Sequence, residues 1–216
     1  MCGRFALGIP RRQLEEHFAA EVPEVPPRIN VAPSQPVLAI RLEHGRRVGR
    51  LLRWGLIPYW AKDEKIGWKT INARAESAAA MPAFRDSLRR RRCLVPADGF
   101  YEWDKSRKPR EPHLFSLADA SPMALAGLWD RWRPLDGGEA VESCTILTCP
   151  ANALVARHHD RMPVILPPSA WAAWLDPATA PGALPALLKT CPAGQMAERL
   201  ADIRINSPDF EPGAPG

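Results

Sequence analysis

The segment between residues 21 and 36 limits the fold more than any other stretch, because it contains five prolines. Proline fixes the backbone angle φ and lacks the amide hydrogen that a helix interior or a central strand requires. The segment is therefore predicted to be an ordered, irregular loop. Before it, Pro10 opens a stretch in which Leu14 and Phe18 lie four residues apart, which predicts a short amphipathic helix at residues 10–20.

Most of the remaining regular structure is predicted to be short strands. Apolar, β-leaning runs bounded by turn residues indicate strands at residues 37–42, 47–54, 93–103, 113–118, 123–129 and 144–149, the third divided by a turn. Helices are expected from about residue 77 to 91, with Pro82 as a break or a second start, and near residues 168–175, 183–190 and 193–201. No repeat or linker divides the chain. A single domain is therefore predicted at residues 1–206, followed by a Pro/Gly-rich tail at residues 207–216.

The composition argues against several classes of protein. The chain has 216 residues, enough for a sizeable core, and no apolar run approaches the ~20 residues that span a bilayer. Its start lacks an apolar signal region, so a cytoplasmic protein is expected. The five cysteines include no C-x-x-C pair and do not combine with histidines at zinc spacing, so no disulfide framework, metal or cofactor is expected. Lys and Arg exceed Asp and Glu by 29 to 24, which permits an anionic partner without requiring one.

Cys2 is the first candidate for chemistry. Removal of Met1, which is usual before a small residue, would leave a chain that begins with a free amine beside a thiol. An α-amine with a pKa near ~8 and a thiol with a pKa near ~8.5 both react at neutral pH. Such a pair can capture an aldehyde as an imine that sulfur closes to a thiazolidine. Alternatively, the thiol acts as a nucleophile with its own amine as base. A third interpretation is that Cys2 is only a buried packing residue.

Three further segments carry candidate residues, each with an ordinary structural alternative. Strand alternation puts Phe100 and Glu102 on one face, so Glu102 is either a partly buried carboxyl suited to acid–base work or a solvent-facing residue. One histidine of the pair at 158–159 could be oriented for proton transfer. The arginines at 89–92 are interpreted as a solvated helix end that could add phosphate affinity.

Four motifs, taken together and in order, resemble the SRAP (SOS response-associated peptidase) family. They are Met1-Cys2-Gly3-Arg4-Phe5, Asn72-Ala73-Arg74-Ala75-Glu76, Gly99-Phe100-Tyr101-Glu102-Trp103 and His159-Asp160-Arg161-Met162-Pro163, with similar segments at 30–33 and 54–58. The resemblance extends from residue 2 to about residue 205. It implies an α+β (mixed α/β) fold with a curved, barrel-like antiparallel β core and short peripheral helices.

The resemblance also implies a function, namely sensing of abasic sites on single-stranded DNA during the DNA damage response. Cys2 would form a thiazolidine crosslink with the open-chain deoxyribose. His159 would move protons as the sugar opens, Glu102 would assist the amine, and Asn72 would orient the N-terminus or the sugar. The residues implied to contact DNA are Arg4, Arg74, Trp68, Pro33 and Thr148.

The expected partner is single-stranded DNA containing abasic sites, bound by a monomer without a metal, so the protein would be nucleoid-associated when it holds DNA. Two alternatives remain open. One is a cysteine-type peptidase that uses Cys2 to remove Met1 itself. The other is a DNA-binding module without covalent chemistry.

Overall fold

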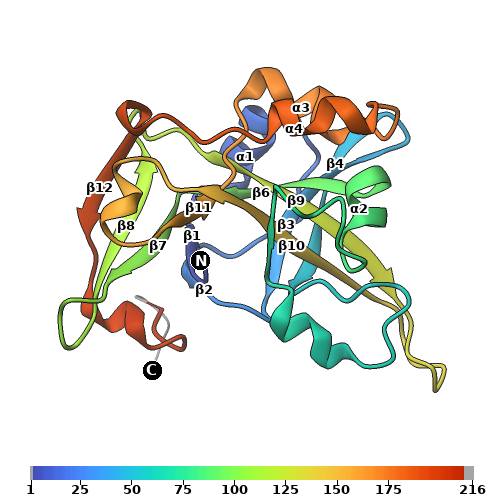
Figure 1. Cartoon of the computed structure of the whole chain (residues 1–216), viewed down its shortest axis with the longest axis horizontal. Helices are drawn as coiled ribbons and strands as arrows, with labels where there is room; N and C mark the ends of the chain where they lie inside the picture. The colour runs from blue at the N-terminus through green and yellow to red at the C-terminus, as the bar shows by residue number, and fades with distance from the viewer. Residues whose placement is uncertain (1, 212–216) are drawn as a thin grey trace.

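The computed structural model describes residues 2–211, whose strands form two sheets (Figure 1). The first sheet lies on the left of Figure 1 and has the strand order β12, β8, β7, β1, β2. In that order, the strands are Met196–Leu200, Glu111–Leu117, Gly99–Asp104, Phe5–Leu7 and Arg28–Val31. Neighbouring strands of this sheet are antiparallel.

Five strands of the second sheet close into a barrel. The ring runs through β10, β4, β3, β6 and β9 and returns to β10. The strands are Val141–Pro150, Arg46–Trp54, Pro36–Glu43, Arg92–Ala97 and Met123–Trp132. Two short strands, β5 (Asn72–Arg74) and β11 (Arg161–Pro163), add to β10. The predicted α+β fold with a barrel-like core is thus confirmed, although β10 pairs in parallel with β4 and β5 rather than antiparallel.

The helices are short and lie around the sheets, with α3 and α4 above the barrel in Figure 1. The α-helices are α1 Arg11–Phe18, α2 Arg85–Arg90, α3 Pro168–Leu175 and α4 Leu184–Leu187. Short 3-10 helices occupy Glu64–Lys69, Val155–Arg157, Pro181–Ala183, Ala193–Gln195 and Ile203–Asn206. Within residues 2–211, every helix is too short or too polar to cross a bilayer.

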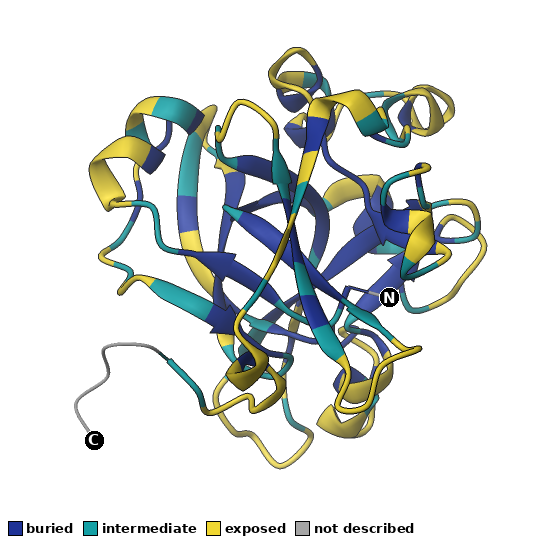
Figure 2. Ribbon diagram, turned by 90° about the vertical axis from the view of Figure 1, so that its left-hand side faces the viewer, coloured by how far each residue is buried: buried dark blue, intermediate teal, exposed yellow. Residues whose placement is uncertain are grey.

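The core lies inside the barrel and between the barrel and the first sheet. Figure 2 shows the central strands as buried and the loops and outer helix faces as exposed. The rings of Phe5 on β1 and Trp54 on β4 pack 5.2 Å apart, and both side chains are almost fully buried. Burial of such rings removes a large apolar area from water, so this contact holds the N-terminal strand against the barrel.

The predicted loop at residues 21–36 contains a strand, which corrects the sequence prediction. β2 pairs with β1 through Phe5 and Val31. Pro26 and Pro27 precede β2 and Pro33 follows it, so no proline falls among its four paired residues. β2 is also the last strand of its sheet. The prolines therefore bound the strand, at an edge where a missing amide hydrogen is tolerated.

Three predicted helices are shortened or absent, and of the one near residues 183–190 only α4 is α-helical. Of the stretch from about residue 77 to 91, only α2 is helical, and most of residues 75–84 form turns. Pro82 has no amide hydrogen to donate, so the helix begins after it, as the second-start alternative predicted. Residues 193–201 form a 3-10 turn and strand β12 instead of a helix. The reason is long-range, because β12 pairs along its whole length with β8.

The interpretation of the arginine run as a solvated helix end is confirmed for Arg89 and Arg90, which are exposed in the last turn of α2, but is wrong for Arg92. Arg92 is only 3% exposed, and its guanidinium donates to the carbonyl oxygens of Leu88, Arg89, Trp174 and Asp176. These oxygens belong to the C-terminal ends of α2 and α3, which lack helical donors of their own. Arg92 therefore joins two helix ends to the barrel and is not available to phosphate.

The first residues of the predicted C-terminal tail contact β2. The amide of Asn30 donates to the carbonyl oxygens of Ser207 (2.7 Å) and Phe210 (2.8 Å). The Glu211 carboxylate accepts from the backbone nitrogen of Ile29 at 3.0 Å. The rest of the tail lies outside the described residues, and the domain boundary at residue 206 stays a prediction.

Candidate active site

Cys2 lies just before β1, and the pairing of β1 with β7 fixes its place. The backbone nitrogen of Tyr101 donates to the carbonyl oxygen of Arg4 at 2.9 Å, so the antiparallel register continues from β1 toward Cys2 and from β7 toward Glu102. The Cys2 side chain is fully buried, and its sulfur lies 3.9 Å from the same Arg4 oxygen. Cys2 is thus held just ahead of β1, which lies between β7 and β2 in the first sheet.

Asn72 binds Cys2 from the side of the barrel. It is the first residue of β5, which β10 holds in parallel register through Ile146. Its side-chain nitrogen donates to the carbonyl oxygen of Cys2 at 2.7 Å, in a buried hydrogen bond. A neutral amide of this kind orients its partner without adding a charge. The structure therefore brings together two predicted catalytic residues that lie 70 positions apart in the chain.

Glu102 and Cys2 interact electrostatically inside the protein. Glu102 is 3% exposed, so the solvent-facing alternative is wrong. Burial raises the pKa of the Glu102 carboxyl, and the positive charge of Lys105 acts in the opposite direction. Burial, together with the nearby Glu102 carboxylate, raises the pKa of the Cys2 thiol to about 12. The expectation of a partly ionised thiol is therefore corrected, because the buried thiol is neutral at pH 7.

His159 lies in the turn before β11 and is neutral at pH 7. Burial lowers the pKa of His159, and the positive charge of Lys105 lowers it further. The backbone nitrogen of Arg161 donates to Nδ1 of His159 at 3.0 Å, which places the proton of the neutral ring on Nε2. Asp160 also approaches Nδ1, at 2.9 Å, but its side chain is 82% exposed and solvent screens its charge. Since Lys105 affects the pKa of both His159 and Glu102, these two groups lie within range of one cation.

An ion pair that the sequence does not predict anchors the segment that carries His159. The Arg161 guanidinium donates to both carboxylate oxygens of Glu76, each at 2.8 Å, and to the carbonyl oxygen of Thr148 at 2.6 Å. A two-point contact of this kind fixes orientation as well as distance. Glu76 and Arg161 each belong to a motif noted in the sequence, but nothing in the sequence pairs them.

Three of the predicted DNA-contacting residues lie at the surface. Arg74 is exposed, Trp68 is 60% exposed on its 3-10 helix, and Pro33 is half-buried. A cation and an aromatic ring at the surface can contact a phosphate and stack on a base, respectively. Their predicted role in DNA binding stays a prediction.

The other two predicted DNA contacts are engaged within the fold. Arg4 donates from Nη1 to Asn30 Oδ1 (2.7 Å) and to the carbonyl oxygen of Ile205 (2.9 Å), and burial lowers its pKa. Thr148 is fully buried, and its hydroxyl lies 3.4 Å from the carbonyl oxygen of Ala73. A direct contact between the Thr148 side chain and DNA is therefore not supported, since β5 and Arg161 cover it.

A cavity of about 990 Å³ lies apart from these residues. Its lining includes Trp171 of α3, Leu117 of β8, Ala124 of β9 and Cys191. The lining is largely apolar and contains none of the four predicted catalytic residues. The candidate site is consequently defined by the buried polar contacts around Cys2 rather than by a deep cavity.

Comparison with known proteins gives consistent matches over nearly the whole chain. A family model described as SOS response associated peptidase (SRAP) matches residues 1–208. The abasic site processing protein YoqW of Bacillus subtilis (strain 168) is 43% identical over 215 residues, which cover 96% of this chain and 95% of YoqW. The abasic site processing protein YedK of Escherichia coli (strain K12) is 31% identical over 182 residues, which cover 81% of this chain and 79% of YedK. The crystal structure of a protein from Bacteroides thetaiotaomicron has the same fold, with a TM-score of 0.89, 24% identity and 97% coverage of both chains.

Proposed function

Because this chain belongs to the SOS response associated peptidase (SRAP) family, we propose that it processes abasic sites in single-stranded DNA by forming a crosslink through Cys2. YoqW and YedK are each named as abasic site processing proteins, which supports the substrate class. The observation that carries the proposal is the 2.7 Å hydrogen bond from Asn72 to the Cys2 carbonyl oxygen, beside the buried carboxyl of Glu102. It holds the first residues of the chain at one place, next to a group that can exchange protons.

The reaction begins with the α-amine of Cys2, which becomes free when Met1 is removed. Met1 itself lies outside the described residues. The amine nitrogen attacks the C1′ aldehyde of the opened deoxyribose and gives a carbinolamine, which loses one water to form an imine. The sulfur then adds to the imine carbon, and the thiol proton ends on the ring nitrogen. Because the pKa of the thiol is raised to about 12, sulfur attacks second, after a base has removed its proton.

Glu102 is the base and acid of these steps. Its carboxyl is buried and its pKa is raised, which suits a group that takes a proton near neutral pH and returns it. It accepts the thiol proton as sulfur attacks and delivers a proton to the hydroxyl that leaves the carbinolamine. Asn72 holds Cys2 in place through its carbonyl oxygen throughout.

His159 acts on the sugar before the amine does. The closed sugar opens when the proton of the C1′ hydroxyl is transferred to the ring oxygen. A neutral imidazole with its proton on Nε2 can donate that proton and accept the other. The ion pair between Arg161 and Glu76 keeps the backbone beside His159 in position.

The surface residues Arg74, Trp68 and Pro33 bind the strand on either side of the lesion. Arg74 neutralises a phosphate, and the exposed ring of Trp68 stacks on an unpaired base. Arg4 can bind a phosphate only after its hydrogen bond to the carbonyl oxygen of Ile205 is broken. One chain supplies every group named, so the protein acts as a monomer.

The test is crosslinking to an oligonucleotide whose uracil has been removed by uracil glycosylase. The wild-type chain is expected to give a band that resists denaturation, and Cys2→Ala is expected to give none. A band of equal intensity from Cys2→Ala would refute the mechanism. Extra residues ahead of Cys2 separate the proposal from a non-covalent DNA-binding module, since binding would survive the extension and crosslinking would not.

The peptidase alternative is separated by the same proteins. A neutral, buried thiol is a poor peptide nucleophile, so we expect no turnover of added peptides. Loss of Met1 from Cys2→Ala as readily as from wild type would assign its removal to a separate aminopeptidase. Retention of Met1 in Cys2→Ala alone would favour self-cleavage.

A further inference from the structure

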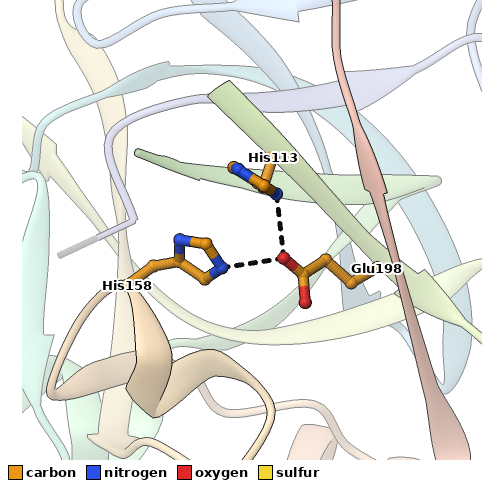
Figure 3. Close-up of side chains that lie close together, drawn as sticks. All are labelled: His113, His158 and Glu198. Carbon is orange, nitrogen blue, oxygen red and sulfur yellow. Dashed lines mark hydrogen bonds and ion pairs between the residues drawn. The ribbon is translucent and has the colours of Figure 1, made fainter. Parts of the chain in front are cut away.

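Three side chains outside the proposed mechanism converge on one point (Figure 3). His113 lies on β8, His158 follows the 3-10 turn at Val155–Arg157, and Glu198 lies on β12. Nδ1 of His113 lies 2.8 Å, and Nε2 of His158 lies 2.7 Å, from the same oxygen, Oε1 of Glu198. The other oxygen of Glu198 pairs with Arg157. Two imidazole nitrogens and one carboxylate oxygen therefore face one another.

The sheet register explains why these residues meet. Glu198 pairs with Phe115, which lies two residues beyond His113, so His113 and Glu198 project from the same face as diagonal neighbours. The His158 ring stacks beside the His113 ring, with centroids 4.3 Å apart, and its edge packs on Phe115. The three side chains are 17%, 9% and 13% exposed, so the group is nearly closed but reachable from solvent.

The separations lie close to those of a zinc site. Zn²⁺ binds nitrogen and oxygen ligands at about 2.0–2.1 Å, so two ligands of a tetrahedral ion lie about 3.4 Å apart. The three donor atoms here all lie within 4.8 Å of one another. The two contacts with Oε1 would have to open by about 0.6 Å, which small χ rotations of a glutamate supply. Arg157 can keep its hold on the second oxygen during this movement.

We propose that His113, His158 and Glu198 bind one Zn²⁺ ion, with water in the fourth position. Imidazole and carboxylate together suit zinc, whereas Mg²⁺ prefers oxygen ligands only. The ion would join β8 and β12 to the segment immediately before His159. The site adjoins the proposed reaction centre, because His113 pairs with Glu102 across β8 and β7, but its three ligands are distinct from the residues assigned to crosslinking. The sequence did not predict it, because its ligands lie 45 and 40 residues apart (158 − 113 and 198 − 158) and match no zinc spacing.

The test is a zinc titration of chelator-stripped protein against a chromogenic chelator. It is done in a Cys2→Ala background, because an N-terminal amine and thiol would bind zinc themselves. One Zn²⁺ per chain is expected, with no competition from Mg²⁺. Glu198→Gln and His113→Gln should each weaken zinc binding at least tenfold, since even indirect partners of a metal ligand contribute ~10–100-fold to affinity. Co²⁺ in place of Zn²⁺ should give visible d–d absorption that both variants lose.

His44→Asn is the matched control. His44 is exposed in the turn between β3 and β4 with φ of 49°, a conformation that Asn tolerates, so this variant removes an imidazole without disturbing the cluster. Its zinc binding should equal that of the parent. No zinc binding by the parent, or equal binding by the parent and His113→Gln, would overturn the proposal and leave a hydrogen-bonded His–Glu–Arg network. Circular dichroism of the zinc-free proteins confirms the fold of each variant, and His113→Gln decides the outcome if Glu198→Gln does not fold.

Discussion

The buried thiol of Cys2 should react with an alkylating reagent far more slowly in the folded chain than in the unfolded chain. Only the thiolate is nucleophilic, and burial together with Glu102 raises the pKa of this thiol to about 12. At pH 7.5 a free cysteine with a pKa of ~8.5 is about one-tenth ionised. A thiol with a pKa of about 12 is ionised to roughly 3 parts in 100,000, which is about 3,000-fold less.

The alkylation rate falls by less than the thiolate fraction does, because a thiolate of higher pKa is intrinsically more nucleophilic. A Brønsted coefficient of about 0.4–0.5 returns roughly 40-fold over this change in pKa. The net expectation is alkylation about 80-fold slower than in the unfolded chain, before any steric barrier from burial is added. The rate should also keep rising with pH beyond ~8.5, where a free cysteine levels off.

The assay is timed labelling with iodoacetamide, followed by peptide mapping of Cys2 in native buffer and in urea. Glu102→Gln supplies the diagnostic comparison, because loss of the carboxylate lowers the pKa of the Cys2 thiol. This variant should alkylate Cys2 faster but crosslink abasic DNA more slowly. Equal labelling rates in native buffer and in urea, or a plateau near pH ~8.5, would refute the reasoning.

Three further predictions concern Asn72, Glu76 and His159. Asn72→Ala should lower the free energy of unfolding by about 1–2 kcal/mol in urea titrations, because the buried Cys2 carbonyl oxygen loses its donor, and it should slow crosslinking. Glu76→Gln should lower the free energy of unfolding by only about 1 kcal/mol, since the Glu76 side chain is 50% exposed, and it should slow crosslinking because Arg161 is held less firmly. The control Glu24→Gln, on a side chain that is 83% exposed, should change neither the stability nor the crosslinking rate. Crosslinking should slow as the Cys2 amine becomes protonated below pH ~8. The lowered pKa of His159 predicts that loss of the neutral imidazole adds a second decline only below pH ~6.5, and a second decline that survives in His159→Gln would belong to Glu102 instead.

The sequence predicted elements well where local patterns decide the structure. The hairpin at residues 37–54, the division of residues 93–103, which falls at Asp98, and the buried strand at 144–149 are all present. The sequence-based predictions were wrong where pairing with a strand distant in the sequence determines the secondary structure. β2 exists because β1 pairs with it, and β12 exists because β8 pairs with it. Neither pairing leaves a trace in the local composition, so the five prolines at residues 21–36 predict a loop and residues 193–201 by themselves predict a helix.

The burial of Arg92 also depends on distant residues. Four successive arginines predict a solvated helix end, because the sequence alone does not indicate which of their side chains is buried. Arg92 is the inward one, and it satisfies carbonyl oxygens of two helix ends that no backbone donor reaches. The same holds for the Cys2 thiol. The sequence alone supports only the pKa of a solvated cysteine, near ~8.5, whereas burial and Glu102 in the fold raise the pKa to about 12.

The arrangement of the candidate site depends on one strand that the sequence treated as ordinary core. β10 pairs with β5 at residues 146–148 and with β11 at residues 148–150. The first pairing places Asn72 against Cys2, and the second places Arg161 under Thr148 and beside Glu76. Thr148 is therefore important as a buried junction between these pairings rather than as a DNA contact. The nearly isosteric change Thr148→Val replaces the hydroxyl by a methyl group with little change in volume. It should leave Arg161 bound to the Thr148 backbone oxygen, so crosslinking should survive Thr148→Val and fail in Thr148→Trp, which has to separate β5 from β10.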